Sequence, residues 1–130
     1  METNKAKHGT INWRDLTVEN ADSLKEFYRD LAGWDTEAIP MKNDEESYHD
    51  YVMKDSEGNA VGGICHAKGV NTGIPPQWIM YISVDNISDS VEKALNGGGK
   101  LIKEYKSKDG NLVYAMMEDP AGAVFALAQI

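Results

Sequence analysis

The sequence predicts an α+β fold in which two βαβββ modules pair around a concave pocket, and two observations support this prediction. First, the segment LTVENADSLKEFYRDLAG (residues 16–33) has an echo in ISVDNISDSVEKALNGGG (residues 82–99), 66 positions later (82 against 16). Each copy holds a β-rich tripeptide ending in valine, an acidic residue, an asparagine, a helix-like stretch and a glycine. Second, three strand candidates follow each helix. Because one helix covers only part of an apolar sheet, pairing the modules closes their sheets around a central concavity.

The first module begins with a predicted strand, GTINWRDLTV, over residues 9–18. Asn20 is expected to cap the helix that follows, its side chain accepting hydrogen bonds from the open amides of the first turn. Gly33 supplies the left-handed residue at which this helix ends. Four apolar residues lie at the spacing of one helical face and predict its buried stripe: Leu24, Phe27, Tyr28 and Leu31.

Three further strands are predicted in the first module: WDTEAIPM (34–41), YHDYVMKD (48–55) and NAVGGICHA (59–67). Residues 56–59, SEGN, have the composition of the turn that joins the last two strands. Glycines and a Pro-Pro pair break regular structure in the segment that follows, which predicts a linker over residues 68–77. The two modules therefore span residues 9–67 and 78–130.

The second module repeats this order. WIMYISV (78–84) is a predicted strand, and Asn86 or Ser88 caps the next helix. The stripe of this helix consists of Ile87, Val91, Ala94 and Leu95. The glycines at 97–99 end it, and three strands follow: KLIKEYKS (100–107), NLVYAMME (111–118) and GAVFALAQI (122–130). Asp109-Gly110 predicts a hairpin turn, and residues 119–122 predict another tight turn.

Length and composition predict one soluble domain over residues 9–130, preceded by a flexible tail over residues 1–8. The chain has 130 residues, of which 42% are hydrophobic and 26% charged, typical of a globular protein. No apolar run approaches the length of a membrane span, so no membrane partner is expected. The first residues, METNKAKHG, lack the apolar core of a signal peptide, which favours a cytoplasmic location.

Charge and cysteine content exclude several classes of function. The net charge of −8 makes nucleic acid an unsuitable partner, because phosphate binding requires a basic surface. An acidic surface that attracts a cationic ligand is a minor alternative to an ordinary solvated one. Cys65 is the single cysteine, so the chain forms no intrachain disulfide and contains no CxxC redox or zinc site.

Several motifs resemble the vicinal oxygen chelate superfamily, which includes glyoxalase I, bleomycin-resistance proteins and extradiol dioxygenases. They are LTVENADSLKEFY, SVDNISDSVEKALNGGG and EDPAGAVFAL, and together the resemblance covers residues 9–130. The segment GVNTGIPPQW is similar to one found in a subgroup of small glyoxalase-like proteins. The resemblance implies the glyoxalase/bleomycin-resistance fold, in which the concave pocket (the predicted cup) binds a small molecule.

The resemblance also implies where a metal would be held. Metal-dependent members take one ligand from the first strand and one from the last strand of each module. In this chain those four positions are Trp13, Gly63, Ile79 and Ala126. None of these side chains offers an oxygen, imidazole or thiolate ligand to a divalent cation. We therefore expect no metal and no other cofactor in the cup.

Strand alternation predicts which residues line the cup. Residues two apart in a strand face the same way, so Asp15 shares the cup with Trp13, and Tyr81 shares it with Ile79. Asp15 and Tyr81 are equivalent by the internal repeat, and Cys65 lies two residues beyond Gly63. A carboxylate that faces a concave interior is costly unless it is paired or hydrated, which makes Asp15 the strongest indication of function. The remaining predicted wall residues are Tyr114, Met116 and Ala126.

Three readings of the function stay open at this point. The first is a non-catalytic protein that binds a small, flat or apolar molecule in the cup. The second is a metal-free lyase or isomerase in which Asp15 acts as general base and Tyr81 as general acid. The third is a module whose only role is to dimerise or to bind a partner, with the wall residues closing an inert core. The apolar strands at 78–84 and 122–130 alternate poorly, which favours a homodimer.

Overall fold

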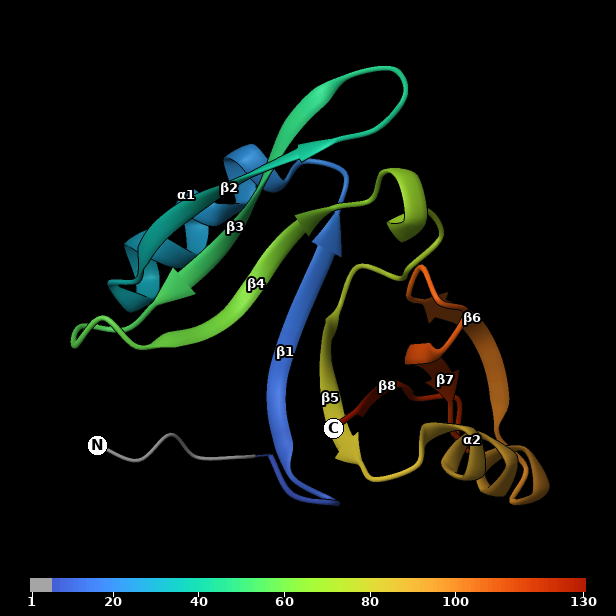
Figure 1. Cartoon of the computed structure of the whole chain (residues 1–130). Helices are drawn as coiled ribbons and strands as arrows, with labels where there is room; N and C mark the ends of the chain where they lie inside the picture. Colours follow the sequence, from blue (N-terminus) through green and yellow to red (C-terminus); the bar gives the residue numbers. More distant parts are fainter. Residues whose placement is uncertain (1–5) are drawn as a thin grey trace. The chain divides into compact units, whose positions relative to one another are not determined.

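A computed structural model describes residues 6–130 of the chain. Its elements, drawn in Figure 1, occur in the following order: β1 (Ile11–Val18), α1 (Ala21–Ala32), β2 (Asp35–Lys42), β3 (Ser47–Lys54), β4 (Ala60–His66), the 3₁₀ helix η1 (Gly69–Asn71), β5 (Trp78–Val84), α2 (Ile87–Asn96), β6 (Lys100–Lys106), β7 (Leu112–Glu118) and β8 (Val124–Gln129). The order βαβββ thus occurs twice, as the internal repeat predicts. The α+β fold class is confirmed.

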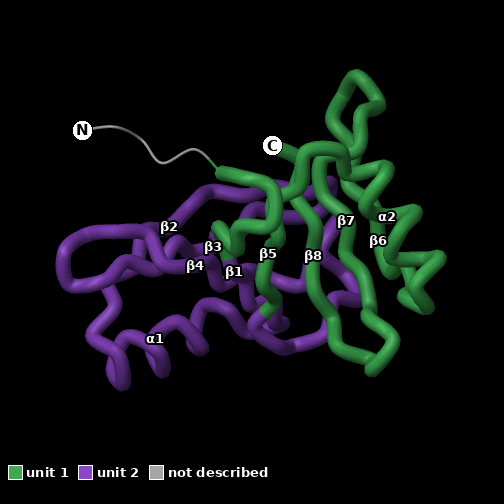
Figure 2. Tube along the Cα trace, turned by 90° about the horizontal axis from the view of Figure 1, so that it is seen from below, with its two compact units in different colours: residues 1–13, 79–130 green, residues 14–78 purple. Residues whose placement is uncertain are grey.

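The chain folds into two compact units, coloured separately in Figure 2. Unit 2 is Arg14–Trp78, and unit 1 combines Ile79–Ile130 with the described residues that precede Arg14. The segment at 68–77, predicted as a linker, lies within unit 2. Residues 1–5 of the predicted tail lie outside the described residues. His8, at the end of that tail, accepts a hydrogen bond from the backbone N–H of Asp85 at 3.1 Å.

The strands have equivalent orders in the two units. In unit 2 the order is β2-β3-β4-β1, and in unit 1 it is β6-β7-β8-β5. The first and last strands of each unit pair in parallel, and the remaining pairs are antiparallel. Asp15 lies opposite Gly63 in one parallel pair, and Tyr81 lies opposite Ala126 in the other. The register therefore places Tyr81 as the equivalent of Asp15, as the repeat predicts.

Each helix covers one face of the strands in its own unit. In unit 2, α1 packs on β2, β3 and β4, and in unit 1, α2 packs on β6, β7 and β8. The core of unit 2 consists of Leu16, Val18, Ala21, Tyr51, Met53 and Ile64, and the core of unit 1 consists of Val84, Ile87, Val91, Ala115, Met117 and Leu127. Burial of these apolar side chains drives the folding of both units. The opposite face of each set of strands remains for the predicted site.

The helix ends confirm two predictions and correct a third. Gly33 ends α1 in the left-handed conformation with φ of 69°, and the Asn86 side chain accepts from the N–H of Asp89 at 3.1 Å. Asn20 does not cap α1 through its side chain. Its amide NH₂ instead donates to Ser23 Oγ at 3.3 Å, while the Ser23 hydroxyl donates back to the Asn20 carbonyl at 3.2 Å. This exchange turns the side chain away from the open amides.

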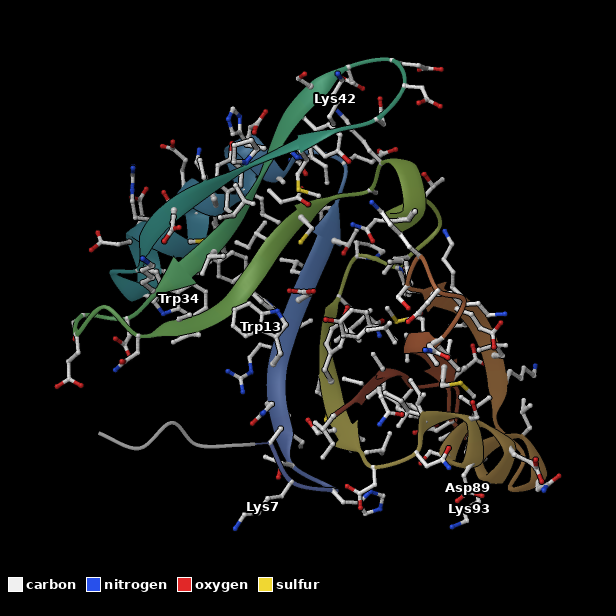
Figure 3. All side chains as sticks on the ribbon, viewed as in Figure 1. Lys7, Trp13, Trp34, Lys42, Asp89 and Lys93 are labelled. Carbon is white, nitrogen blue, oxygen red and sulfur yellow. The ribbon has the colours of Figure 1, made fainter. Side chains whose placement is uncertain are left out.

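The predicted apolar stripes are wider than the buried faces of the helices. On α1, Leu24 and Tyr28 pack against the core, whereas Phe27 is 58% exposed and Leu31 is 61% exposed. On α2, Leu95 is likewise exposed. The core of unit 2 reaches only one side of the stripe, where Tyr28 stacks on Trp34 (labelled in Figure 3) with ring centroids 5.9 Å apart. Apolar spacing predicts an amphipathic helix, but the tertiary contacts decide how much of its apolar face is covered.

No helix among residues 6–130 is long and apolar enough to cross a membrane.

Candidate functional site: polar and aromatic faces of the two units

Asp15, Gly63 and Cys65 share the face of unit 2 opposite the helix, as strand alternation predicts. Asp15 lies in β1 and is paired in register with Gly63 of β4. A Cβ built at Gly63 would overlap the Asp15 Oδ1 atom and lie 3.6 Å from Cys65 Sγ. The carboxylate therefore occupies the space that a side chain at position 63 would fill. Asp15 itself is half-buried.

Asp50 joins this face from β3 and is not among the site residues predicted from the sequence. Its side chain is buried, and it hydrogen-bonds the thiol of Cys65. Its Oδ1 also accepts from the backbone N–H of His66 at 2.8 Å. The available signal was the alternation of β3, which puts Asp50 on the same face as Val52 and opposite to Tyr51. The face thus carries two carboxylates beside one thiol.

This arrangement keeps Cys65 protonated. Burial strongly raises the pKa of the Cys65 thiol, and the negative charges of Asp15 and Asp50 raise it further. Because the thiolate is the nucleophile and the metal ligand, a thiol with a raised pKa serves neither purpose near neutral pH. Cys65 instead acts as a neutral hydrogen-bond donor to Asp50.

A buried histidine connects this face to helix α1. His66, the last residue of β4, is buried and its ring is hydrogen-bonded. Its Nδ1 lies 2.7 Å from the carbonyl oxygen of His49, so Nδ1 carries a proton and donates it. Its Nε2 lies 3.7 Å from Asp22 Oδ1, the same oxygen that accepts a hydrogen bond from the Tyr51 hydroxyl. The ring is therefore fixed in one orientation.

The Asp22–Tyr51 hydrogen bond favours a charged carboxylate and a neutral phenol. Donation from the Tyr51 hydroxyl is the largest cause that lowers the pKa of Asp22, and the nearby His66 lowers it further. Burial, then the hydrogen bond to Asp22 and its negative charge, raise the pKa of Tyr51 to about 12. No sequence spacing links these residues, because they come from α1, β3 and the end of β4.

Unit 1 presents an aromatic face in the corresponding place. Tyr81 and Met116 are each paired in register with Ala126, so all three side chains lie on one face. The rings of Tyr81 and Tyr114 meet edge to face, with centroids 5.7 Å apart. Tyr105 of β6 extends the row, its ring centroid 6.5 Å from that of Tyr114. Tyr105 is not among the predicted wall residues, although it alternates in β6 with Lys103.

The remaining predicted wall residues differ in accessibility. Ile79, Met116 and Ala126 are almost fully buried, so they fill space beneath the surface, whereas Tyr114 is 43% exposed. Trp13, labelled in Figure 3, is half-buried and projects from β1.

The chemistry of a metal site does not fit the residues at the four positions that the family resemblance implies. Trp13 offers only an N–H donor, and Ile79 and Ala126 offer no donor atom. At Gly63 the space is occupied by the Asp15 carboxylate. Within the described range 6–130, no group of three or more His, Cys, Asp or Glu side chains is placed to hold a metal ion.

A family model described as "Glyoxalase-like domain" matches residues 15–128. Two proteins named "Putative glyoxylase CFP32", from Mycobacterium bovis and Mycobacterium tuberculosis, are 32% identical to the chain over 125 residues. The match covers 95% of this chain and 46% of each relative. The anthracycline biosynthesis protein DnrV of Streptomyces peucetius is 24% identical over 132 residues, covering 92% of this chain and 46% of its own length. The chain thus spans about half the length of these relatives.

Solved structures share the fold at low sequence identity. Methylmalonyl-CoA epimerase of Streptomyces coelicolor, in complex with 2-nitronate-propionyl-CoA, is 12% identical with a TM-score of 0.56, covering 95% of this chain and 98% of the epimerase. The Mycobacterium tuberculosis epimerase is 14% identical with a TM-score of 0.57, covering 99% and 92% of the two chains. The hypothetical protein BH1468 of Bacillus halodurans is 10% identical with a TM-score of 0.62, covering 95% and 96%.

Proposed function

Because the chain belongs to the glyoxalase-like domain family of the vicinal oxygen chelate superfamily, we propose that it binds a small, flat or apolar molecule in the predicted cup without a divalent metal. The observation that carries the proposal is the position of Asp15 over Gly63. Metal-dependent members of the superfamily hold a ligand side chain at this position, and here a carboxylate from the neighbouring strand takes its place. Asp15 provides a hydrogen-bond acceptor beside the Cys65 thiol, and the aromatic row of unit 1 provides a flat apolar surface.

In the proposed site, the aspartates supply polar contacts to the ligand and the tyrosines supply apolar contacts. Asp15 and Asp50 accept hydrogen bonds, and their charges keep Cys65 neutral. Tyr81 and Tyr114 present ring faces and edges for stacking on a planar group. A few polar groups among aromatic and aliphatic walls are typical of sites for small organic ligands.

A ligand screen tests this function. Purified protein is melted with a panel of planar aromatic and short acyl compounds, and compounds that raise the melting temperature are titrated by calorimetry. We expect Asp15→Asn to weaken binding about tenfold, since the lost interaction is a hydrogen bond to a charged group. Asp44→Asn removes the same charge from an exposed loop position and serves as the matched control. Equal affinity of the two variants would refute a binding role for Asp15.

A second variant tests the site without removing the carboxylate. In Gly63→Ala the new Cβ overlaps Asp15 Oδ1, so the end of the Asp15 side chain must move from this position. We expect the ligand affinity to fall as in Asp15→Asn, although the carboxylate is still present. Unchanged affinity would show that the position of Asp15 over Gly63 has no part in binding.

The alternative function is a metal-free lyase or isomerase reaction, with Asp15 as general base and Tyr81 as general acid. The edge-to-face contact with Tyr114 favours this alternative because it holds the Tyr81 ring in a defined orientation. Asp15 and Tyr81 belong to different compact units, so their cooperation stays a prediction. Turnover of a compound from the screen, with a pH-rate profile altered by Asp15→Asn and by Tyr81→Phe, would favour catalysis. Stoichiometric binding without turnover would favour the first function.

We also propose that the chain forms a homodimer. The exposed Phe27 and Leu31 of α1 form an apolar surface, and burying it against a second copy would stabilise the association. Light scattering at micromolar concentration should give about twice the monomer mass of 14.4 kDa. Serine at positions 27 and 31 should shift the mass toward the monomer, whereas Leu95→Ser, at an exposed leucine of α2, should leave it unchanged. A monomer mass for the wild-type protein would refute the dimer.

A further inference from the structure

A cavity lies within unit 2, at the end of the parallel pair formed by β1 and β4. Its volume is about 520 Å³, which is within the usual range for small-molecule sites. Thr17 and Val18 of β1 form part of its wall, together with Ala67, which directly follows β4. Glu19 and Asn20, directly after β1, and the segment that follows η1, including Thr72 and Ile74, supply the rest. Neither Asp15 nor Cys65 lines this cavity.

The cavity has an apolar floor and a rim of hydrogen-bond acceptors. Val18 and Ile74 are buried and apolar, whereas Glu19 and Asn20 are exposed. The Glu19 carboxylate makes no hydrogen bond or ion pair with any described residue. The Asn20 amide uses its NH₂ on Ser23, which leaves its oxygen as an acceptor. A ligand that fits this arrangement has an apolar body and a positively charged donor at one end.

Among residues 6–130, no basic side chain lines the cavity. Lys68, which follows Ala67, pairs with Glu46 at 3.1 Å, and Lys25 of α1 donates from its ammonium to the Asp22 carbonyl at 2.8 Å. An anionic ligand would therefore find no counterion and would be repelled by Glu19. The net charge of −8 for the whole chain also favours cations near its surface.

The N-terminus of helix α1 opposes the preference of the cavity for a cation only weakly. The helix begins at Ala21, and its dipole corresponds to about half a positive charge at that end. Asp22 lies in the first turn with a full negative charge, since the hydrogen bond from Tyr51 lowers its pKa. Together with Glu19, it makes the local electrostatic balance negative. The dipole therefore does not convert the cavity into an anion site.

We propose that this cavity binds a small organic amine, with its aliphatic or aromatic body on Val18 and Ile74 and its ammonium group at Glu19 and Asn20. The site is separate from the one proposed around Asp15 and does not depend on it. Thr17 is buried and lines the cavity. It lies on the same face of β1 as Asp15, so it marks the boundary between the cavity and the site proposed around Asp15.

Three probes of equal chain length distinguish charge from apolar burial: n-hexylammonium, 1-hexanol and hexanoate. Each is titrated into isotope-labelled full-length protein near neutral pH, and backbone amide shifts are followed. We expect n-hexylammonium to move the amide signals of Val18, Glu19 and Ala67 and of residues 72–74. Hexanol should bind more weakly, and hexanoate should cause no shifts there. Equal binding of n-hexylammonium and hexanol, or binding of hexanoate, would overturn the proposal.

Variants then test the assigned residues. Glu19→Gln should weaken n-hexylammonium binding about threefold, the effect of one exposed charge, and added salt should weaken binding to the wild-type protein. Glu57→Gln removes an equal charge from the β3–β4 turn and should leave the affinity unchanged. Asp15→Asn should also leave it unchanged, even if the proposed ligand of the cup is lost. Equal affinities of the Glu19→Gln and Glu57→Gln variants, or loss of binding in Asp15→Asn, would refute the separate site.

Discussion

Tyr51 should make the protein lose stability above pH 10, and the size of the loss follows from its environment. The phenol ionises with its ordinary pKa of 10.0 in the unfolded chain, whereas in the folded protein its pKa is raised to about 12. Below pH 10 both states keep the proton, so the stabilisation is fully present. Between pH 10 and about 12 the unfolded chain releases the proton while the folded protein retains it. Stability therefore falls as pH rises through this interval.

The expected loss is about 1.4 kcal/mol for each pH unit above 10, since one pKa unit corresponds to 1.36 kcal/mol. At pH 11 the folded protein should have lost about 1.4 kcal/mol through Tyr51 alone. Little discount for solvent screening applies, because Tyr51 is only 8% exposed. In Tyr51→Phe this pH-dependent loss is absent. That variant should also be less stable by about 1 kcal/mol at pH 8, because it lacks the hydrogen bond to Asp22.

Urea unfolding followed by circular dichroism at pH 8 and pH 11 measures these free energies. The difference between wild type and Tyr51→Phe isolates the contribution of one phenol from the general effect of alkaline pH. Tyr48→Phe, which removes a phenol outside the hydrogen bond to Asp22, is the control and should follow the wild type. If wild type and Tyr51→Phe lose equal free energy between the two pH values, the proposed environment of Tyr51 is wrong.

Three further predictions concern caps, packing and metals. Asn86→Ala should cost about 1 kcal/mol of stability in urea unfolding, because the Asn86 side chain caps the Asp89 amide, whereas Asn20→Ala should cost clearly less; equal costs would contradict the capping geometry. Gly62→Ala should destabilise the protein by about 1–3 kcal/mol, because its Cβ would lie 2.8 Å from the Arg14 carbonyl oxygen, and a thermal melt that matches the wild type would disprove this clash. Protein purified without added metal should hold less than stoichiometric zinc, nickel or iron by elemental analysis, and chelation should not change its melting temperature; a stoichiometric metal or a chelator-induced loss of stability would show that the ligand positions are misassigned.

Local sequence determined the order of elements and most of their ends. The repeat of valine, acidic residue and asparagine marks equivalent strand-to-helix transitions, and it predicts the equivalence of Asp15 with Tyr81 that the sheet register shows. Turn residues act over a few positions, so Asp109-Gly110 and the tight turn at 119–122 were predictable. The shared face of Asp15, Gly63 and Cys65 follows from strand alternation once the register between their two strands is known.

Only the tertiary structure decided which asparagine caps its helix and which apolar helix residues are buried. Asn20 and Asn86 occupy equivalent positions, yet only Asn86 caps its helix, because the Asn20 side chain bonds Ser23 instead. The exposure of Phe27 depends on how far the core extends beneath α1, which apolar spacing does not reveal.

The contacts among the buried and exposed polar groups of unit 2 could not be predicted from the sequence. Asp22, Asp50, Tyr51 and His66 come from three elements separated by as many as 44 positions (66 against 22), and no local pattern relates them. Asp50, Tyr51 and His66 are buried where β3, β4 and α1 meet, and burial requires each of these polar groups to find a partner. Sequence determined which side chains each strand and helix presents, and packing between those elements decided which of them meet.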